Sequence, residues 1–288
     1  MKPSPFEYVR ATSVEDAVAA LASYGDRAKL LAGGQSLIPM MNFRMIAPEV
    51  LIDIANISDL AVIETGDAEM RIGAGAKHHA VMASDDVKRQ CPLLANAYSH
   101  VAYSTVRNRG TIGGNLCHHD PASEVPLVLT LMGASLVLAG PSGTRTVPAD
   151  TFFLGMMETA IADDEILVRV DVPFQADGEG WSFHEMSTRK GDYAIVCAGV
   201  RLRVQDGAFS DVRMGFNGAG TETKRMAEVE QALEGKPATD ETIASAMKLA
   251  AEVADPMDDV QAEVAYKRDL VSALGRRALE QARDRAGN

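Results

Sequence analysis

Apolar and polar positions in residues 1–55 predict one helix and two strands. Ser13 precedes a run of apolar residues at helical spacing, which is typical of an N-capped amphipathic helix. Those apolar positions are Val14, Ala17, Val18 and Leu21. AKLLAGG at 28–34 predicts a buried strand that runs into a glycine turn, and VLIDIA at 50–55 predicts a second strand. Residues 1–55 therefore predict a small α/β subdomain.

The pattern changes after residue 55. Short strand signals punctuated by glycine and proline predict a larger α+β subdomain over 56–176, with helices near 85–100 and 125–132. The strand signals are EMRIGAGAK, ASLVLAG, TRTVPA and EILVRVDVP. The polar, glycine-containing stretch that ends at Gly180 marks a boundary, so we expect one domain over 1–176 and another over 177–288.

The second domain begins with strands and ends with helices. WSFHEMS, YAIVCAGVRLRV and FSDVRMGFNG predict three strands, and helical periodicity follows at about 225–234, 240–254 and 262–283. The last of these carries a mostly apolar stripe that includes Leu270, Leu274 and Leu279. We therefore expect a three-stranded sheet covered by helices.

Composition excludes several classes of function. The chain has 288 residues, 47% of them hydrophobic, which is enough to bury large cores in about two domains. A net charge of −12 disfavours nucleic acid as a partner. No segment approaches a signal peptide or a membrane span, so we expect a cytoplasmic protein. The three separated cysteines, Cys91, Cys117 and Cys197, suggest neither a disulfide framework nor an iron–sulfur cluster.

The stretch RNRGTIGGNLCHHDPASE, residues 107–124, contains residue types that bind metals or move protons. Cys117, His118, His119 and Asp120 are consecutive, and in an extended segment they alternate between opposite faces. They cannot all close around one ion, so we expect no metal site. The two histidines are expected in a turn that leads into a helix near Val125, and no catalytic residue is predicted.

Two glycine pairs are the remaining candidates for ligand binding, because the common nucleotide-binding and nucleophile motifs are absent. The sequence contains no G-x-x-x-x-G-K-[ST] or G-x-G-x-x-G motif, and GQSLI around Ser36 does not complete G-x-S-x-G. AGGQS at 32–36 and TIGGN at 111–115 are two-glycine turns flanked by hydroxyl residues. Paired glycines permit positive φ and bring successive N–H groups close to an anion. Together the two turns favour a diphosphate ligand.

Three long segments resemble one known family. They are KLLAGGQSLIPMMNFR (29–44), VRNRGTIGGNLCHHDPASEVP (106–126) and RKGDYAIVCAGV (189–200). They are similar to the FAD-binding medium subunit of the molybdenum hydroxylases, the xanthine dehydrogenase and aerobic carbon monoxide dehydrogenase family. The resemblance implies an α+β, PCMH-type fold. In that fold a small α/β subdomain and an antiparallel-sheet subdomain hold FAD, and a three-stranded sheet with a helical bundle follows.

The resemblance also assigns a cofactor-binding set. It consists of Lys29, Leu30, Leu31, Ala32, Gly33, Gly34, Gln35, Ser36, Val101, Thr111, Ile112, Gly113, Gly114, Asn115, Glu124, Leu167, His184 and Tyr193. Alternative interpretations stay open at several positions. Glu124 could be a charge at a helix N-terminus, Val101, Leu167 and Tyr193 could be core residues, and His184 stands where eukaryotic xanthine dehydrogenases have lysine.

The function implied by the resemblance is that of an oxidoreductase subunit. FAD would be bound non-covalently, whereas molybdopterin and [2Fe-2S] clusters would reside in a large and a small partner subunit, in a dimer of heterotrimers. The flavin would carry the electron chemistry, with the protein supplying position and electrostatics. A stand-alone FAD-dependent oxidase or reductase and a non-enzymatic scaffold remain as alternatives. The large subunit would select the substrate, and the sequence identifies neither the substrate nor the final electron acceptor.

Overall fold

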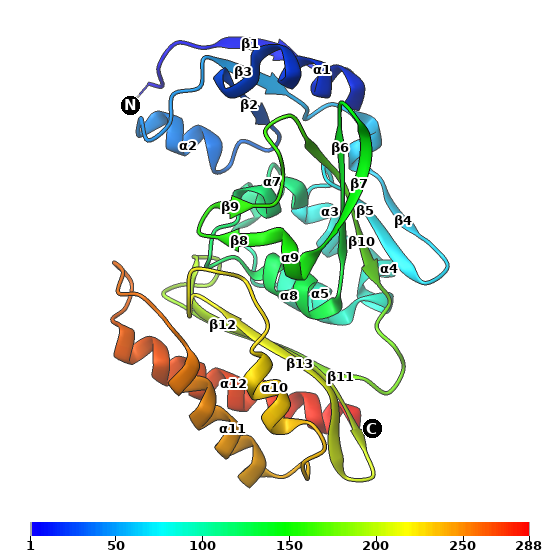
Figure 1. Ribbon diagram of the computed structural model, residues 1–288, viewed down its shortest axis with the longest axis vertical. Helices are drawn as coiled ribbons and strands as arrows, with labels where there is room; N and C mark the ends of the chain where they lie inside the picture. Colours follow the sequence, from blue (N-terminus) through cyan, green and yellow to red (C-terminus); the bar gives the residue numbers. More distant parts are fainter. Residues whose placement is uncertain (1, 288) are drawn as a thin grey trace.

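A computed structural model describes residues 2–287 and shows three stacked parts (Figure 1). The first part is a parallel sheet in the order β1-β3-β2 with two helices. Its elements are β1 (Glu7–Arg10), α1 (Val14–Tyr24), a 3₁₀ turn (Gly25–Arg27), β2 (Ala28–Leu31), α2 (Leu37–Asn42) and β3 (Val50–Asp53). Ser13 caps α1 by accepting the Asp16 N–H, as the sequence predicts. Strand β1 is short and mostly exposed, and the sequence pattern did not predict it.

The second part is an antiparallel sheet in the order β4-β5-β10-β6-β7, with helices packed beside it (Figure 1). Its strands are β4 (Ile63–Thr65), β5 (Glu69–Gly73), β6 (Ser135–Gly140), β7 (Gly143–Pro148) and β10 (Ile166–Pro173), with the hairpin β8 (Phe153–Gly155) and β9 (Glu158–Thr159). Its helices are α3 (His78–Ala83), α4 (Asp85–Gln90), α5 (Pro92–Tyr98), α6 (Ser104–Arg107), α7 (Ile112–His118), α8 (Glu124–Met132) and α9 (Ala149–Phe152), and a 3₁₀ turn spans Ser58–Ala61.

The third part is an antiparallel sheet in the order β11-β12-β13 with three helices, coloured yellow to red in Figure 1. Its elements are β11 (Gly180–Ser187), β12 (Ala194–Gln205), β13 (Ala208–Asn217), α10 (Ala227–Leu233), α11 (Asp240–Val253) and α12 (Val264–Ala286). The strands and helices that the sequence predicts for this region are confirmed. The α+β class and the C-terminal sheet with helices are confirmed with them.

Helix α8 joins the second and third parts. All nine of its residues are buried, and it packs against α5 on one side and against β12 and β13 on another. Phe183, Ala194 and Cys197 of the third part belong to the same apolar cluster as α5 and α8. Because the core is continuous there, the side chains at the junction are held in fixed positions. The domain boundary between residues 176 and 177 stays a prediction. None of the helices within 2–287 is long and apolar enough to cross a membrane.

Candidate functional site

The structure brings the two glycine segments together. A Cβ on Gly33 would stand 2.3 Å from the Arg109 carbonyl oxygen and 2.7 Å from the Gly110 Cα. A Cβ on Gly114 would stand 3.9 Å from the Ala32 Cβ. Two segments far apart in sequence therefore meet at the end of β2, at the carboxyl edge of the parallel sheet.

The AGGQS segment presents a run of unpaired donors. Within residues 2–287, the backbone N–H groups of Gly33–Ser36 donate to no acceptor of the chain. Gly34 adopts φ +70°, a left-handed conformation that glycine takes without strain. Partly buried N–H groups require a hydrogen-bond partner, and successive free N–H groups around a left-handed glycine can bind an anion. The segment has the donor set that a diphosphate needs.

The TIGGN segment has a different structure from the turn expected. Thr111 is the N-cap of α7, and its hydroxyl accepts the Gly114 N–H at 3.0 Å. The N–H groups of Ile112 and Gly113 donate to the carbonyls of Ala76 and Ala74. The expectation of positive φ at this glycine pair is wrong, because both glycines lie in the first turn of a helix.

Close packing explains these two glycines instead. A Cβ on Gly113 would stand 2.6 Å from the Ala74 Cβ, so only glycine fits at that position. Gly114 is exposed, and a Cβ there would meet the Thr111 hydroxyl at 2.9 Å. The segment therefore offers a bare surface beside Ala32 rather than free backbone donors.

Two cations lie beside the free donors and were not predicted from the sequence. Lys77 pairs with Thr111 in an isolated β-bridge and is about half-buried. Burial, and then the charge of Arg109, lower the pKa of Lys77, while the Asp53 carboxylate acts in the opposite direction. In the sequence, GAGAKH (73–78) does not complete the G-x-G-x-x-G motif, and nothing local to its lysine indicates a ligand. Lys77 and Arg109 make the potential around Gly33 favourable for an anion.

Tyr193, from the third part of the chain, lies close to Ser36 at the end of the run Gly33–Ser36. It lies in the turn before β12, the residue is 56% exposed, and the Ser36 side chain is a hydrogen-bonding neighbour of its hydroxyl. Gly191 in the same turn adopts φ +90° and packs on Ala102. Burial of the hydroxyl raises the pKa of Tyr193, and Asp120 raises it further. An exposed ring is not a core residue, so the alternative interpretation of Tyr193 is wrong.

The apolar candidates lie nearby but are buried. Val101 and Leu167 are 4% and 3% exposed and belong to the main apolar cluster. Strand β10 is irregular between Leu167 and Arg169, and the carbonyl of Val168 accepts the Ala74 N–H next to Gly113. Core packing therefore accounts for Val101 and Leu167, and their role in cofactor binding stays a prediction. Lys29–Leu31 lie in β2, which leads into the free N–H donors of Gly33–Ser36.

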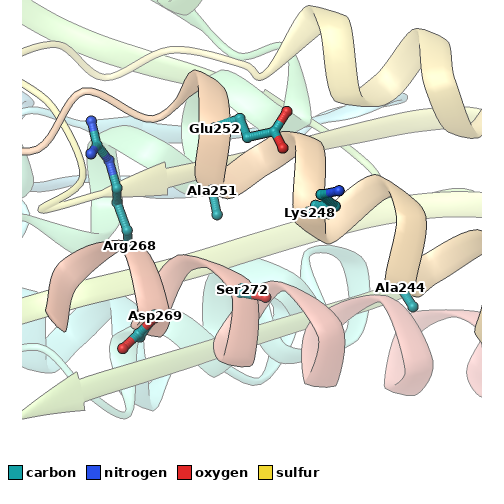
Figure 2. Close-up of a pocket in the computed structure, with 7 residues that line it drawn as sticks. All are labelled: Ala244, Lys248, Ala251, Glu252, Arg268, Asp269 and Ser272. Atoms are coloured by element: carbon teal, nitrogen blue, oxygen red, sulfur yellow. The ribbon is translucent and has the colours of Figure 1, made fainter. Parts of the chain in front are cut away.

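His184 lies apart from this set. It lines a hollow of about 510 Å³ together with Arg277 and Arg285 of α12. Another hollow, of about 590 Å³, lies between α11 and α12 and is lined by Lys248, Arg268 and other residues (Figure 2). Neither includes a residue of the glycine segments. The structure does not bring His184 together with the other candidates.

The two histidines after the glycines are not both loop residues. His118 is the last residue of α7, and His119 is its C-cap with φ +42°. His119 is fully buried, with Nδ1 3.1 Å from the Glu158 carbonyl oxygen and Nε2 3.0 Å from the Thr223 hydroxyl. Both ring nitrogens are engaged, so His119 fixes the chain after α7. Among residues 2–287 no cluster of three or more His, Cys, Asp or Glu could hold a metal ion.

Glu124 begins α8 and is buried against a second carboxyl group. Its side chain contacts Glu185 of β11, across the junction between the second and third parts. Burial, and then the charge of Glu185, raise the pKa of Glu124 well above its ordinary value. Glu185 was not predicted as a site residue, because a glutamate in a strand gives no signal of its partner.

Comparisons with known proteins agree over the whole chain. A family model described as the FAD binding domain in molybdopterin dehydrogenase matches residues 4–175. A second, described as the CO dehydrogenase flavoprotein C-terminal domain, matches residues 181–282. The carbon monoxide dehydrogenase medium chain of Hydrogenophaga pseudoflava is 37% identical over 98% of each chain. The 6-hydroxypseudooxynicotine dehydrogenase complex subunit alpha of Paenarthrobacter nicotinovorans is 37% identical over 99% of this chain and 97% of that one.

Solved structures give the same result. Carbon monoxide dehydrogenase from Hydrogenophaga pseudoflava, in a form that lacks the Mo-pyranopterin moiety of its cofactor, superimposes with a TM-score of 0.96. The two chains are 38% identical, and the match covers 99% of each. Quinoline 2-oxidoreductase from Pseudomonas putida 86 gives a TM-score of 0.95 at 33% identity over all of both chains.

Proposed function

The chain belongs to the FAD-binding medium subunits of the molybdopterin dehydrogenases, and from this membership we propose that it is the electron-transfer subunit of a heterotrimeric hydroxylase or dehydrogenase. It contains an FAD-binding domain and is an oxidoreductase subunit. In the proposal, electrons from [2Fe-2S] clusters of a small partner subunit pass through FAD to an external acceptor. Molybdopterin resides in a large partner subunit.

One observation supports the FAD site above the others, namely the four free N–H groups of Gly33–Ser36. In the proposal they donate to the diphosphate, whose charge Lys77 and Arg109 offset. The first turn of α7, Thr111–Asn115, would cover the opposite side, and the ring of Tyr193, which is a neighbour of Ser36, would lie near the flavin. A ribose contact of Glu124 stays a prediction, because its side chain is buried beside Glu185. His184 has no contact in the structure that supports a cofactor role.

FAD supplies the electron-transfer chemistry when bound, and the chain binds and orients it. The three free thiols are too far apart in sequence for a cluster motif, so iron–sulfur ligands are assigned to a partner. The relatives are medium chains or subunits of multi-subunit enzymes, which supports a dimer of heterotrimers as the assembly. A cytoplasmic location stays a prediction from the sequence.

Anaerobic reduction tests the proposal. The FAD-loaded chain is mixed with carbon monoxide, purines, aldehydes and N-heterocycles, alone and with the two partner subunits. We expect flavin reduction by an organic or gaseous substrate only when the partners are present. Reduction of the lone chain at a rate comparable to that of the complex would establish a stand-alone oxidase instead.

Acid precipitation tests the mode of attachment. No histidine or cysteine lies among the free donors of Gly33–Ser36, so we expect all the flavin in the supernatant. Colour that stays in the pellet would show a covalent link.

A further inference from the structure

Helix α7 depends on its surroundings for its position. It has seven residues, two of them glycines, and short helices of low propensity rely on packing for their stability. Its first turn places Gly114 beside Ala32, where a Cβ on Gly114 would stand 3.9 Å from the Ala32 Cβ. Contacts at the other end of α7 therefore affect the surface that α7 presents to Gly33–Ser36.

His119 ends α7 with φ +42°, a left-handed conformation that costs energy for a residue with a Cβ and persists only where neighbouring contacts hold it. Three contacts with the β8–β9 hairpin do so. The His119 carbonyl accepts the Met157 N–H at 3.0 Å, and the ring packs on Phe153 with 4.7 Å between ring centroids. Nδ1 lies 3.1 Å from the Glu158 carbonyl oxygen.

The partners of the His119 ring fix the position of its hydrogen. A carbonyl oxygen only accepts hydrogen bonds, so Nδ1 carries the hydrogen and donates it to Glu158. Nε2 is then an acceptor, and the Thr223 hydroxyl, 3.0 Å away, is its donor. His119 and Thr223 are 0% and 1% exposed. The loop after β13 therefore completes the surroundings of the residue that ends α7.

Asn217, the last residue of β13, adds two hydrogen bonds at the same place. Its side-chain N–H groups donate to the Thr223 hydroxyl at 3.0 Å and to the Ser123 carbonyl at 2.7 Å. The Thr223 oxygen accepts here and donates its own hydrogen to the histidine, so the bonds run in a single direction. Gly218 donates its N–H to the Pro121 carbonyl at 2.8 Å. The third part of the chain thus holds the segment between α7 and α8.

We propose that Thr223 and Asn217 are positioning residues for the FAD site, because they hold α7 in place through His119 and the segment that follows it. The inference rests on the proposed function, in which the first turn of α7 covers the cofactor. It assigns these two residues an effect on FAD binding that requires no contact with FAD. A chain that loses these bonds has α7 in place for a smaller fraction of the time, and its apparent FAD affinity falls by that fraction.

Thr223→Val removes the donor to His119 and nearly keeps the size of the side chain. Nε2 and one amide hydrogen of Asn217 would be buried without a partner, so the dissociation constant of FAD should rise about tenfold. Thr223→Ser restores the hydroxyl and should bring the constant to within about twofold of the unmodified chain. Flavin fluorescence titration measures both, at a temperature where circular dichroism shows that the chains are folded.

Thr130→Val is the matched control. It also removes a buried hydroxyl, but Thr130 lies in α8, where it donates to the Pro126 carbonyl at 3.0 Å. It should leave the dissociation constant of FAD unchanged, as Thr223→Val would if Thr223 only stabilised the fold. Folded Thr223→Val that binds FAD as tightly as the unmodified chain would overturn the inference and leave the FAD site intact. A Thr223→Ser chain as weak as Thr223→Val would overturn it as well.

Nitrogen-15 NMR of the histidine rings tests the direction of the bonds. At neutral pH the His119 signal should show a protonated Nδ1 and an unprotonated Nε2. Its absence from the spectrum of His119→Asn identifies it, and asparagine tolerates the positive φ. The opposite tautomer would make the ring the donor to Thr223, and the inference would fail.

Hydrogen exchange tests the inference in the unmodified chain, even if Thr223→Val does not fold. By linkage, contacts that favour FAD binding are in turn favoured by bound FAD. FAD should therefore slow exchange of the Gly218 amide by the same factor of about ten. The Gly235 amide, which donates to the Phe209 carbonyl elsewhere in the third part, is the reference and should not change.

Equal exchange at Gly218 with and without bound FAD would overturn the inference alone. A chain that does not bind FAD at all overturns the proposed function, and the inference falls with it.

Discussion

Gly33 packs against Arg109 so closely that a Cβ on residue 33 would stand 2.3 Å from the Arg109 carbonyl oxygen. That contact joins the end of β2 to the segment before α7, and it places the free N–H groups of Gly33–Ser36 beside the exposed backbone of Gly114. The geometry of the candidate site therefore depends on the absence of a side chain at residue 33.

Gly33→Ala should therefore separate the two segments. The obstacle is backbone, which cannot rotate away, so one segment must shift at a cost of about 1–3 kcal/mol. We expect the chain to lose most of its FAD, measured as flavin absorbance per polypeptide. Gly220→Ala is the control, because a Cβ there would meet its nearest atom at 3.9 Å and φ is not positive. Full flavin content in Gly33→Ala would show that the two segments can move apart without loss of FAD binding.

Gly114→Val tests the second segment. A Cβ at Gly114 would stand 2.9 Å from the Thr111 hydroxyl, which caps α7, so valine should weaken the cap by about 1 kcal/mol. Its methyl groups would also occupy the bare surface beside Ala32. We expect lower thermal stability and a larger loss of FAD affinity, measured by unfolding and by fluorescence titration.

Thr111→Ala separates these two effects, because it removes the cap and leaves the surface of Gly114 bare. It should lower stability by a similar amount and affect FAD affinity less. Equal losses of affinity in Thr111→Ala and Gly114→Val would mean that only the cap matters.

The sequence predicted long periodic elements better than short ones. Helix α11 and strand β12 carry unambiguous patterns, and the structure has them within a few residues of the prediction. Strand β1 has four residues and is held by parallel pairing with β3, which no local pattern reveals. The sequence predicts a turn where helix α7 lies, because two glycines in the first turn of α7 lower its helix propensity. Tertiary packing against Ala74 outweighs that propensity.

Part of the candidate site could be predicted from the sequence, namely the part whose residues are adjacent in one segment. Gly33–Ser36 stand together in the chain, so paired glycines next to hydroxyl residues indicated an anion site. Lys77 and Glu185 contribute through contacts with Thr111 and Glu124, which are distant in sequence. Pairings of this kind come from the fold, and a single sequence contains no trace of them.

His78 should make stability depend on pH. It is buried at the start of α3, and burial, then the charges of Lys77 and Arg107, lower its pKa to about 4. The unfolded chain binds a proton on this imidazole below about pH 6.5, whereas the folded chain does so only below about pH 4. Its contribution to stability is therefore present above about pH 6.5 and is lost as pH falls through that window, by about 3 kcal/mol.

Urea unfolding of His78→Phe from about pH 7 to about pH 4 checks this. Phenylalanine keeps a ring against Tyr98, which lies 5.8 Å from the His78 ring between centroids, and removes the titration. The variant should lose less stability than the unmodified chain over that range. Parallel curves for the two proteins would show that His78 gains its proton as readily in the folded chain.

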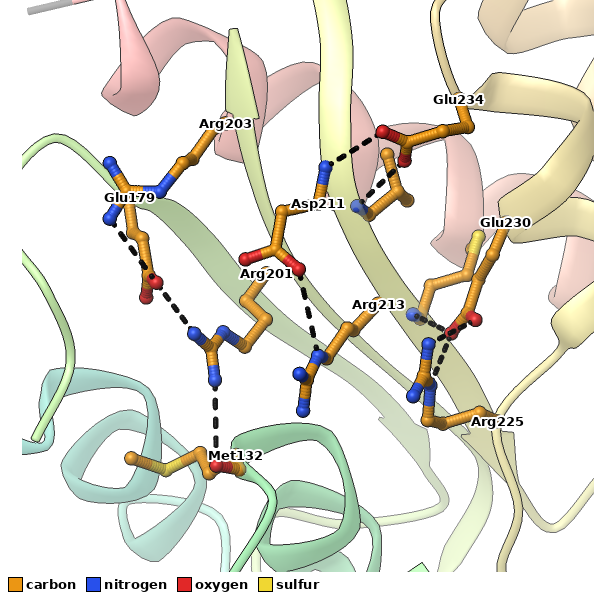
Figure 3. A network of polar contacts seen from close by, with 11 residues as sticks. Met132, Glu179, Arg201, Arg203, Asp211, Arg213, Arg225, Glu230 and Glu234 are labelled. Atoms are coloured by element: carbon orange, nitrogen blue, oxygen red, sulfur yellow. Dashed lines mark hydrogen bonds and ion pairs between the residues drawn. The ribbon is translucent and has the colours of Figure 1, made fainter. Parts of the chain in front are cut away.

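Arg201 should be essential at the junction between the second and third parts (Figure 3). Its guanidinium donates to Glu179 at 2.5 Å and to the Met132 carbonyl, at the C-terminal end of α8, at 3.4 Å. The Glu179 side chain is 3% exposed. Arg201→Met would leave this carboxylate buried with only Arg203, 3.6 Å away, as a partner. We expect a loss of about 3 kcal/mol in the free energy of unfolding, measured in urea.

A double-mutant cycle gives the sharper result. Glu179→Gln removes the charge that Arg201 neutralises, so the double variant should lose clearly less stability than the two single variants added together. Arg276→Met is the control, because Arg276 pairs with Glu280 on an exposed face of α12 and its removal leaves no buried charge. Additive losses at Glu179 and Arg201 would show that the two side chains act independently. The bond from Arg201 to Met132 would then be the whole of its contribution.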